Sequence, residues 1–99
     1  MKLEEYNNLI SQDGIVIVKF SAEWCSPCKS LEKVLDKISE KEPDIKFVKL
    51  DVEEEPELCE NFGIRNVPVL MYYKDGEPKD MTVGMLPEQT IIDKINALR

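Results

Sequence analysis

The sequence predicts an α/β fold in which helices cover both faces of a mixed β-sheet. Three observations support this prediction. Residues 15–20, Ile-Val-Ile-Val-Lys-Phe, form a β-branched run with apolar residues on both faces, as in a central strand. A segment with helical spacing separates this run from a second strand-like segment, and such a crossover makes the two strands parallel. Farther along, the pair Asp75-Gly76 predicts a tight hairpin, which makes the last two strands antiparallel.

The first half of the chain is expected to contain two helices and two strands. Residues 2–11 have apolar side chains at helical spacing, and the turn-forming pair Asp13-Gly14 ends this helix. After the first strand, apolar residues recur at helical spacing from Cys25 to near Glu42, which predicts the second helix. The segment 45–51 is expected to form the second strand.

The second half is expected to add a short helix, two strands and a final helix. An acidic segment opens the short helix, which runs to about Phe62 and ends at Gly63, a residue suited to the backbone at a helix end. Strands are expected over 67–73 and near 79–83, on either side of the hairpin turn. The last helix begins at Pro87, because proline suits the first turn of a helix.

Length and charge restrict the classes of function. Residues 1–99 are expected to form one domain, because single cores commonly extend to about 100–150 residues. The formal net charge of −7 repels phosphate backbones and anionic lipids, so we expect no nucleic-acid partner and no membrane binding. No apolar run approaches the roughly 20 residues that span a bilayer, and the N-terminal sequence shows no secretory signal. These features predict a cytoplasmic protein, and we expect a monomer.

The cysteine content gives the most specific information about chemistry. The chain has three cysteines, Cys25, Cys28 and Cys59, and no histidine. A structural zinc site needs four Cys or His ligands, so no metal is expected, and hydrolases with a histidine base are excluded. Three cysteines are also too few for a disulfide scaffold. What remains is the chemistry of a Cys-x-x-Cys pair in a reducing compartment.

This Cys-x-x-Cys pair lies where the first strand gives way to a helix, in the sequence Trp24-Cys25-Ser26-Pro27-Cys28-Lys29. Two sulfurs at this spacing can close a small disulfide across the first helical turn. Backbone N–H groups and the helix dipole favour the thiolate of Cys25 at the helix N-terminus. We therefore expect Cys25 to be exposed and nucleophilic and Cys28 to be shielded. The alternatives are a static disulfide or half of a metal site, which the reducing compartment and the missing ligands weaken.

Four segments carry further recognisable motifs, in a fixed order along the chain. They are residues 20–29 (Phe-Ser-Ala-Glu-Trp-Cys-Ser-Pro-Cys-Lys), 62–68 (Phe-Gly-Ile-Arg-Asn-Val-Pro), 74–76 (Lys-Asp-Gly) and 83–84 (Val-Gly). Together they resemble the thioredoxin family, and the resemblance extends from Asp13 to the C-terminus. It implies the thioredoxin fold and a thiol–disulfide oxidoreductase activity.

The resemblance also implies a catalytic cycle and a substrate groove. Cys25 would attack a client disulfide, and Cys28 would resolve the mixed disulfide and leave the Cys25–Cys28 pair oxidised. Val67-Pro68 would be a cis peptide whose backbone pairs with an extended client chain. The residues implied as substrate-binding or supporting are Trp24, Ser26, Pro27, Val67, Pro68, Val83 and Gly84.

Partners and cofactors follow from the same resemblance. The dithiol itself carries two electrons, so no bound cofactor is expected. Disulfide-containing client proteins are the implied substrates, and an NADPH-linked thioredoxin reductase or a similar donor is the implied source of electrons. The alternatives are a client-specific redox partner without general reductase activity, or a thioredoxin-fold binding module whose Cys-x-x-Cys pair is incidental.

The sequence departs from the family pattern at four places. Ser26-Pro27 replaces the Gly-Pro of the commonest reductases, and Lys33 stands where many relatives have a helix-kinking proline. The first strand of the family is absent, which leaves a four-stranded sheet of order 2-1-3-4 with the strand at 45–51 at its edge. Lys46 and Lys49 are suited to protecting that edge from pairing with other chains.

Lys19 is the fourth departure, since relatives bury an acid here that exchanges a proton with the resolving cysteine. Strand alternation directs Lys19 to a buried face, where its pKa would fall unless a carboxylate such as Glu23 or Asp51 pairs with it. Alternatively, its stem covers apolar neighbours and its charge reaches the solvent. A cation at this place would favour the Cys28 thiolate and make the couple more oxidising. Lys19 and Lys49 are therefore candidates for tuning the pKa of the cysteines.

Two other features are expected to be structural only. Cys59 is interpreted as a buried small hydrophobe and not as a reactive thiol. The acidic run at 51–60 is interpreted as a solvated helix start, because carboxylates suit the positive end of the helix dipole.

Overall fold

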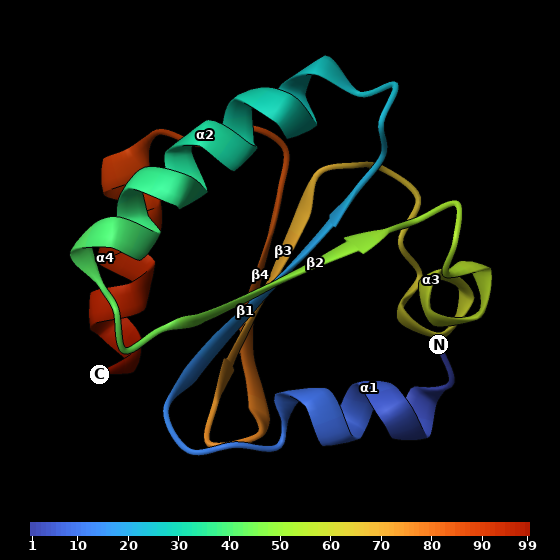
Figure 1. Cartoon of the computed structure of the whole chain (residues 1–99), viewed down its shortest axis with the longest axis horizontal. Coiled ribbons are helices and arrows are strands. Elements are labelled where there is room, and N and C mark those ends of the chain that lie inside the picture. Colours follow the sequence, from blue (N-terminus) through green and yellow to red (C-terminus); the bar gives the residue numbers. More distant parts are fainter.

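The computed structural model describes residues 1–99 and contains four helices and four strands in the predicted order (Figure 1). The strands form one mixed sheet in which the first strand is parallel to the second and antiparallel to the third. The strand order is β2-β1-β3-β4, which confirms the predicted order 2-1-3-4. The elements are α1 (Leu3–Ile10), β1 (Ile15–Ser21), α2 (Ser26–Lys41), β2 (Lys46–Asp51), α3 (Pro56–Phe62), β3 (Val69–Lys74), β4 (Glu77–Val83) and α4 (Glu88–Leu98).

Helices cover both faces of the sheet, as Figure 1 shows. Ile15 and Ile17 of β1 belong to the core cluster that includes residues of α2 and α4. Val16, Val18 and Phe20 of the same strand belong to the cluster on the other face, with residues of α1 and α3. Successive side chains of a strand point to opposite faces, so an apolar run without alternation requires cover on both sides.

The face under α1 and α3 contains a cluster of aromatic rings. The ring of Tyr6 in α1 lies 5.0 Å from that of Phe62 and 6.2 Å from that of Phe20, measured between centroids. The hydroxyls of Tyr6 and Tyr73 are hydrogen-bonded at 2.6 Å. This pair gives both buried phenols a partner, so neither hydroxyl is left unsatisfied in the apolar layer.

Several element boundaries differ from the predicted ones, and three of them show the local cause or the structural context. Strand β3 begins at Val69, two residues later than expected, because Pro68 has no backbone N–H to donate to a strand ladder. Strand β4 begins earlier, at Glu77, and its pairing with β3 shifts register between Tyr72 and Tyr73. Pro87 caps α4 from outside, so that the helix itself starts one residue later.

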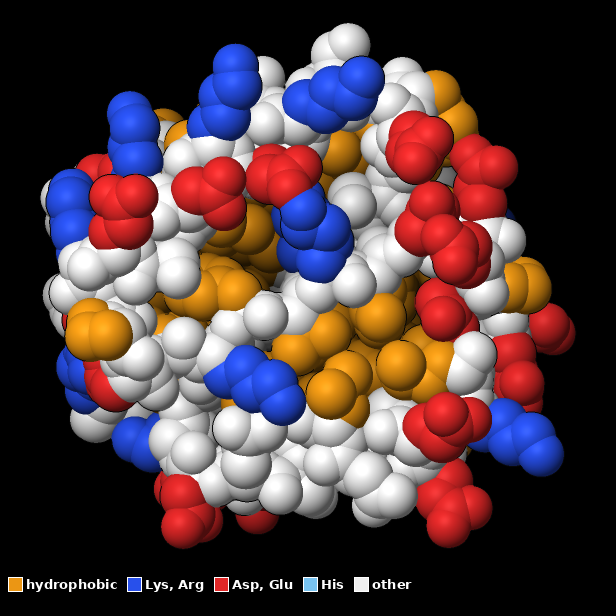
Figure 2. Space-filling view, viewed as in Figure 1, with side chains coloured by type: hydrophobic (Ala, Val, Ile, Leu, Met, Phe, Trp, Pro, Cys, Tyr) orange, Lys and Arg blue, Asp and Glu red, His pale blue; other side chains and the backbone are white.

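Strand β2 lies at one edge of the sheet, as predicted. Figure 2 shows hydrophobic side chains at the surface on both sides of β2, surrounded by charged side chains. Lys46 is exposed at this edge, whereas the charged end of Lys49 pairs with a carboxylate of α2. None of the four helices combines the length and the apolar character needed to cross a membrane.

Candidate active site

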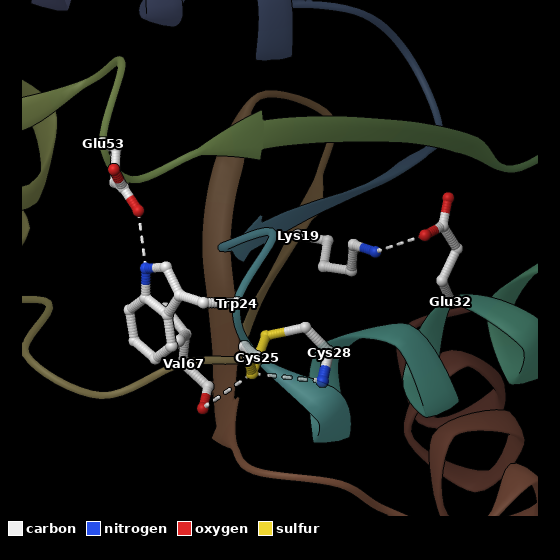
Figure 3. The surroundings of a disulfide bond; sticks show 7 residues. All are labelled: Lys19, Trp24, Cys25, Cys28, Glu32, Glu53 and Val67. Carbon is white, nitrogen blue, oxygen red and sulfur yellow. Dashed lines mark hydrogen bonds and ion pairs between the residues drawn. A yellow bond between two sulfur atoms is a disulfide. The ribbon is translucent and has the colours of Figure 1, made fainter.

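The two paired cysteines lie at the N-terminus of α2, just after the loop that follows β1 (Figure 3). Cys25 is the N-cap residue and Cys28 lies in the first turn; their Cα atoms are 5.3 Å apart and their sulfurs form a disulfide. The Cys28 backbone N–H donates a hydrogen bond to Cys25 Sγ at 3.2 Å. This N–H has no partner inside the helix, so it is free to stabilise negative charge on the Cys25 sulfur.

Both cysteines are buried, and the expectation that Cys25 is exposed was therefore wrong. Cys25 is 5% exposed and Cys28 is 2% exposed, because the side chains of Ala22 and Val67 pack against the disulfide. The two sulfurs nevertheless differ in their surroundings. Cys25 Sγ lies 3.8 Å from the carbonyl oxygen of Val67, whereas Cys28 lines a partly open cavity.

The loop before β3 lies against the disulfide on the Cys25 side (Figure 3). Its Val67–Pro68 bond is cis, which is the isomer expected from the sequence. The Pro68 carbonyl accepts a hydrogen bond from the Gly84 N–H at 2.8 Å. Gly84 has φ of +90°, a conformation that favours glycine. This bond joins the end of β4 to the loop, so Val67, Pro68, Val83 and Gly84 form one connected region beside Cys25.

Trp24 lies on the surface next to the disulfide, with 70% of its area exposed. Its indole N–H donates a hydrogen bond to Glu53 Oε1 at 2.5 Å (Figure 3). Glu53 is a site residue that the sequence did not indicate, since the acidic run was interpreted as solvated only. Nothing in the local sequence pairs two residues that lie on different loops. Ser26 and Pro27 are also exposed, at the first turn of α2.

Lys19 lies on the other side of the cysteines and is only 3% exposed, so its charge does not reach the solvent. Its ion-pair partner is Glu32 of α2, with Nζ and Oε2 3.7 Å apart, and not Glu23 or Asp51 (Figure 3). The other carboxylate oxygen of Glu32 pairs with Lys49. Glu32 follows Cys28 by four residues, and this spacing, which places both on one face of α2, is the sequence signal that could have indicated it.

These charged groups line a cavity of about 260 Å³ behind Cys28. Burial lowers the pKa of the Lys19 ammonium; the nearby Lys49 lowers it further, and Asp36 acts in the opposite direction. The arrangement thus places Lys19, Lys49 and the carboxylate that they share, Glu32, near the less exposed cysteine. Its lining residues are Lys19, Ser21, Ala22, Glu23, Cys28, Lys29, Glu32, Lys49 and Asp51.

Cys59 lies away from this site, in α3, and is half-buried where complete burial was expected. Its thiol donates a weak hydrogen bond to the Val52 carbonyl at 3.9 Å. Burial raises the pKa of this thiol, and Glu55 raises it further. A raised pKa reduces the thiolate fraction, which is the reactive form, so Cys59 has the properties of an inert cysteine.

Comparisons with known proteins agree with this geometry. A family model described as thioredoxin matches residues 1–97. Thioredoxin from Rickettsia typhi is 38% identical over 91 residues, which are 91% of this chain and 87% of that protein. Thioredoxin from Rickettsia bellii is 39% identical over 89 residues, which are 89% of this chain and 85% of that protein.

Two solved structures are similar to this chain in their three-dimensional fold. Oxidised mitochondrial thioredoxin 3 from Saccharomyces cerevisiae superimposes with a TM-score of 0.87 at 32% identity, covering 97% of this chain and 90% of that chain. A variant thioredoxin from Halobacterium salinarum superimposes with a TM-score of 0.88 at 33% identity, covering 99% of this chain and 86% of that chain.

The fold and the paired cysteines at the N-terminus of α2 define a thiol–disulfide oxidoreductase. The dithiol and disulfide forms of such a pair differ by two electrons, which the protein exchanges with other thiols and disulfides. The similarity covers nearly the whole chain and includes the sequence as well as the fold. The chain belongs to the thioredoxin family.

Proposed function

We propose that this thiol–disulfide oxidoreductase reduces disulfides of client proteins, with Cys25 as the nucleophile and Cys28 as the resolving cysteine. The observation that supports these roles is the hydrogen bond from the Cys28 N–H to Cys25 Sγ, which favours a thiolate at Cys25. Cys25 lies beside the loop at Val67, where a client can approach, and Cys28 lines the cavity on the inner side. The dithiol supplies both electrons, so the reaction needs no bound cofactor and no metal.

The groove beside Cys25 suits an extended client segment. The carbonyl of Val67 lies at the disulfide, and an extended chain can pair with backbone groups at this place. Trp24 offers an exposed apolar ring on one side, and Val83, which is 52% exposed, offers an apolar side chain near the other end. Ser26, Pro27, Pro68 and Gly84 are proposed to support this groove.

The oxidised protein must be reduced again after each cycle. We assign this role to an NADPH-linked thioredoxin reductase or a similar dithiol donor, because only a stronger two-electron reductant can regenerate the dithiol. A reducing compartment such as the cytoplasm keeps the client reaction favourable in this direction. The protein is proposed to act as a monomer, without nucleic acid or membrane partners.

The test is a single-turnover reaction between the chemically reduced protein and insulin as the disulfide substrate. Wild-type protein should cleave insulin disulfides and end as the Cys25–Cys28 disulfide. Cys25→Ser should abolish cleavage, and Cys28→Ser should accumulate a mixed disulfide through Cys25. Cys59→Ser is the control and should react like wild type, because Cys59 lies outside the site.

Three results would overturn the proposal. A protein that binds partners but transfers no electrons to insulin or to glutathione disulfide would be a binding module. A protein that equilibrates with glutathione disulfide, yet leaves insulin intact, would be a redox partner restricted to its own clients. Mixed-disulfide capture at Cys28 instead of Cys25 would reverse the two roles.

A further inference from the structure

Six charged side chains line the cavity behind Cys28. Lys19 and Lys49 are register partners on the parallel strands β1 and β2, so their side chains project from the same side of the sheet. Two like charges in this position repel each other. Glu32 reaches down from α2 and contacts both ammonium groups, one with each carboxylate oxygen. The arrangement therefore gives Lys19 a carboxylate partner in a place that solvent scarcely reaches.

Figure 3 shows how Lys19 and Glu32 lie relative to the cysteines. The side chain of Lys19 extends from β1 along the N-terminal turns of α2 toward Glu32, on the same side as the disulfide. Cys28 and Glu32 stand one helical turn apart, and both line the cavity with Lys19. An ammonium in a site of low solvent content acts more strongly on a neighbouring charge than it would in water.

We propose that Lys19 and Glu32 are positioning residues for the resolving step: the Lys19 ammonium stabilises the Cys28 thiolate, and Glu32 keeps that ammonium charged and in place. This inference rests on the proposed role of Cys28 as the resolving cysteine. It adds two residues to the reaction and gives the Lys19–Glu32 ion pair a function.

The step balances as follows for a client held by Cys25 as a mixed disulfide. Cys28 loses its proton to water in the cavity and becomes a thiolate beside Lys19. The thiolate attacks Cys25 Sγ, the Cys25–client disulfide breaks, and the Cys25–Cys28 disulfide forms. The client sulfur leaves as a thiolate and takes a proton from water. The cysteine pair loses two electrons and the client gains them.

The groups around Lys19 act on its charge in opposite directions. Burial and Lys49 both lower the pKa of Lys19, and Asp36 on α2 raises it. Strand β3 places the apolar Leu70 beside Lys19. The remaining charged groups that line the cavity with Lys19 are Glu23 from the loop after β1, Lys29 from α2 and Asp51 from β2. Glu32 is the carboxylate that forms the ion pair, so its loss leaves Lys19 without an ion-pair partner. Burial and repulsion from Lys49 then favour the uncharged amine, and Asp36 acts against them.

The proposal predicts a characteristic change in the Lys19→Met variant. Removing the cation should raise the pKa of Cys28 by about one unit, the lower end of the effect of a nearby opposite charge. At neutral pH the thiolate fraction then falls about tenfold, but a thiolate of higher pKa is intrinsically more nucleophilic. With a Brønsted coefficient of about 0.4–0.5, the resolving step should slow about threefold. At a pH above the Cys28 pKa of both wild type and variant, the resolving step should be about threefold faster in the variant than in wild type.

Ellman's reagent measures this step directly. Mixing it with the reduced protein releases one thionitrobenzoate when Cys25 attacks and a second when Cys28 resolves the mixed disulfide. The second release is independent of reagent concentration, so its rate reports Cys28 alone. All proteins carry Cys59→Ser to exclude the third thiol. The pKa of Cys28 is measured separately by NMR of labelled cysteine in a Cys25→Ser background.

Lys33→Met is the matched control, because it removes the same charge from an exposed position of α2 that forms no ion pair. Its rate profile should superimpose on that of wild type. For Lys19→Met, a resolving rate below that of wild type at neutral pH and above it at high pH supports the proposal. A uniform slowing at every pH would show a structural role only, and an equal change in Lys33→Met would show a general effect of net charge; either result overturns it.

Glu32→Gln tests the second half of the proposal. With the carboxylate gone, Lys19 should be less charged, so Lys19→Met should raise the pKa of Cys28 less in the Glu32→Gln background than in wild type. Equal effects in both backgrounds would show that Glu32 has no part in holding the charge. Loss of the second thionitrobenzoate in wild-type protein would contradict the proposed role of Cys28 instead, so the two failures are distinguishable.

Discussion

The two faces of strand β1 are both buried, but they differ in the side chains that they bury. Val16, Val18 and Phe20 lie on the face under α1 and α3 in a layer that is almost entirely apolar. On the opposite face, the residues at 15 and 17 are apolar, but position 19, next to the cysteine end of α2, is a lysine. One face is thus apolar along its whole length. The other changes within two residues from apolar core to a charged side chain next to the active site.

The polar groups buried on the two faces differ in the same way. The hydroxyls of Tyr6 and Tyr73 satisfy each other and remain uncharged at neutral pH. The Lys19 ammonium has a single carboxylate partner, at 3.7 Å, which it shares with Lys49. A neutral hydrogen-bonded pair is easily accommodated in an apolar layer, whereas a buried charge retains a desolvation cost. A cost of this kind at the active-site end of the strand indicates function more than stability.

The largest expected effect is that of Phe20→Ala, which breaks the apolar face. Phe20 is fully buried, and removal of a buried phenylalanine ring costs about 3–5 kcal/mol. Urea unfolding should show this loss. The dependence of the Cys28 resolving rate on pH should stay as in wild type, since the charged cavity lies across the sheet. A shifted rate profile in this variant would show that the two faces are not independent.

Tyr6→Phe should have the next largest effect on stability. It leaves the Tyr73 hydroxyl with only the sulfur of Met71, 3.9 Å away, and the unsatisfied group should cost about 1–2 kcal/mol. Burial raises the pKa of both phenols above the usual value near 10. The folded state therefore holds these protons more tightly than the unfolded chain does, and stability should fall as the pH rises above 10. This alkaline loss should be smaller in Tyr6→Phe, and unfolding curves at pH 8 to 11 would measure it.

Lys19→Met should change the free energy of unfolding in the opposite direction from the two preceding variants. Replacing a weakly paired buried charge by an apolar side chain should leave stability unchanged or raise it by about 1 kcal/mol at neutral pH. Because the folded-state pKa of Lys19 is lowered, the unfolded chain binds this proton more tightly, so the Lys19 contribution to stability should become more favourable as the pH rises toward 10.5. The advantage of the variant should therefore shrink in alkali. A large destabilisation at neutral pH would instead identify the ion pair as a structural element.

The smallest effect on the free energy of unfolding is expected for Glu53→Ala, since Glu53 lies on neither face of strand β1. The Trp24–Glu53 hydrogen bond is exposed, so its loss should change the free energy of unfolding by no more than about 0.5 kcal/mol. Trp24 is the only tryptophan, and its fluorescence anisotropy should decrease when the indole is released. Unchanged anisotropy would mean that Glu53 does not hold the ring in place.

Local patterns in the sequence were sufficient for most of the fold. Uninterrupted apolar residues in β1 predicted cover on both sides, and Asp75-Gly76 predicted the hairpin between β3 and β4. The predicted site was reliable where it depended on position along the chain, as for the cysteines at the start of α2. It was wrong where it depended on packing, since Cys25 is buried and the partner of Lys19 is Glu32.

The sequence by itself determined the order of the elements, the parallel and antiparallel pairings and the placement of Cys25 and Cys28 on a helix terminus. These features follow from periodicity, turn residues and the covalent spacing of neighbours, which act over a few residues. Only the tertiary structure decided that Glu32 pairs with both Lys19 and Lys49 and that Glu53 accepts a hydrogen bond from Trp24. Such contacts depend on strand register and on how α2 lies across the sheet, and these are set by the packing of the whole core.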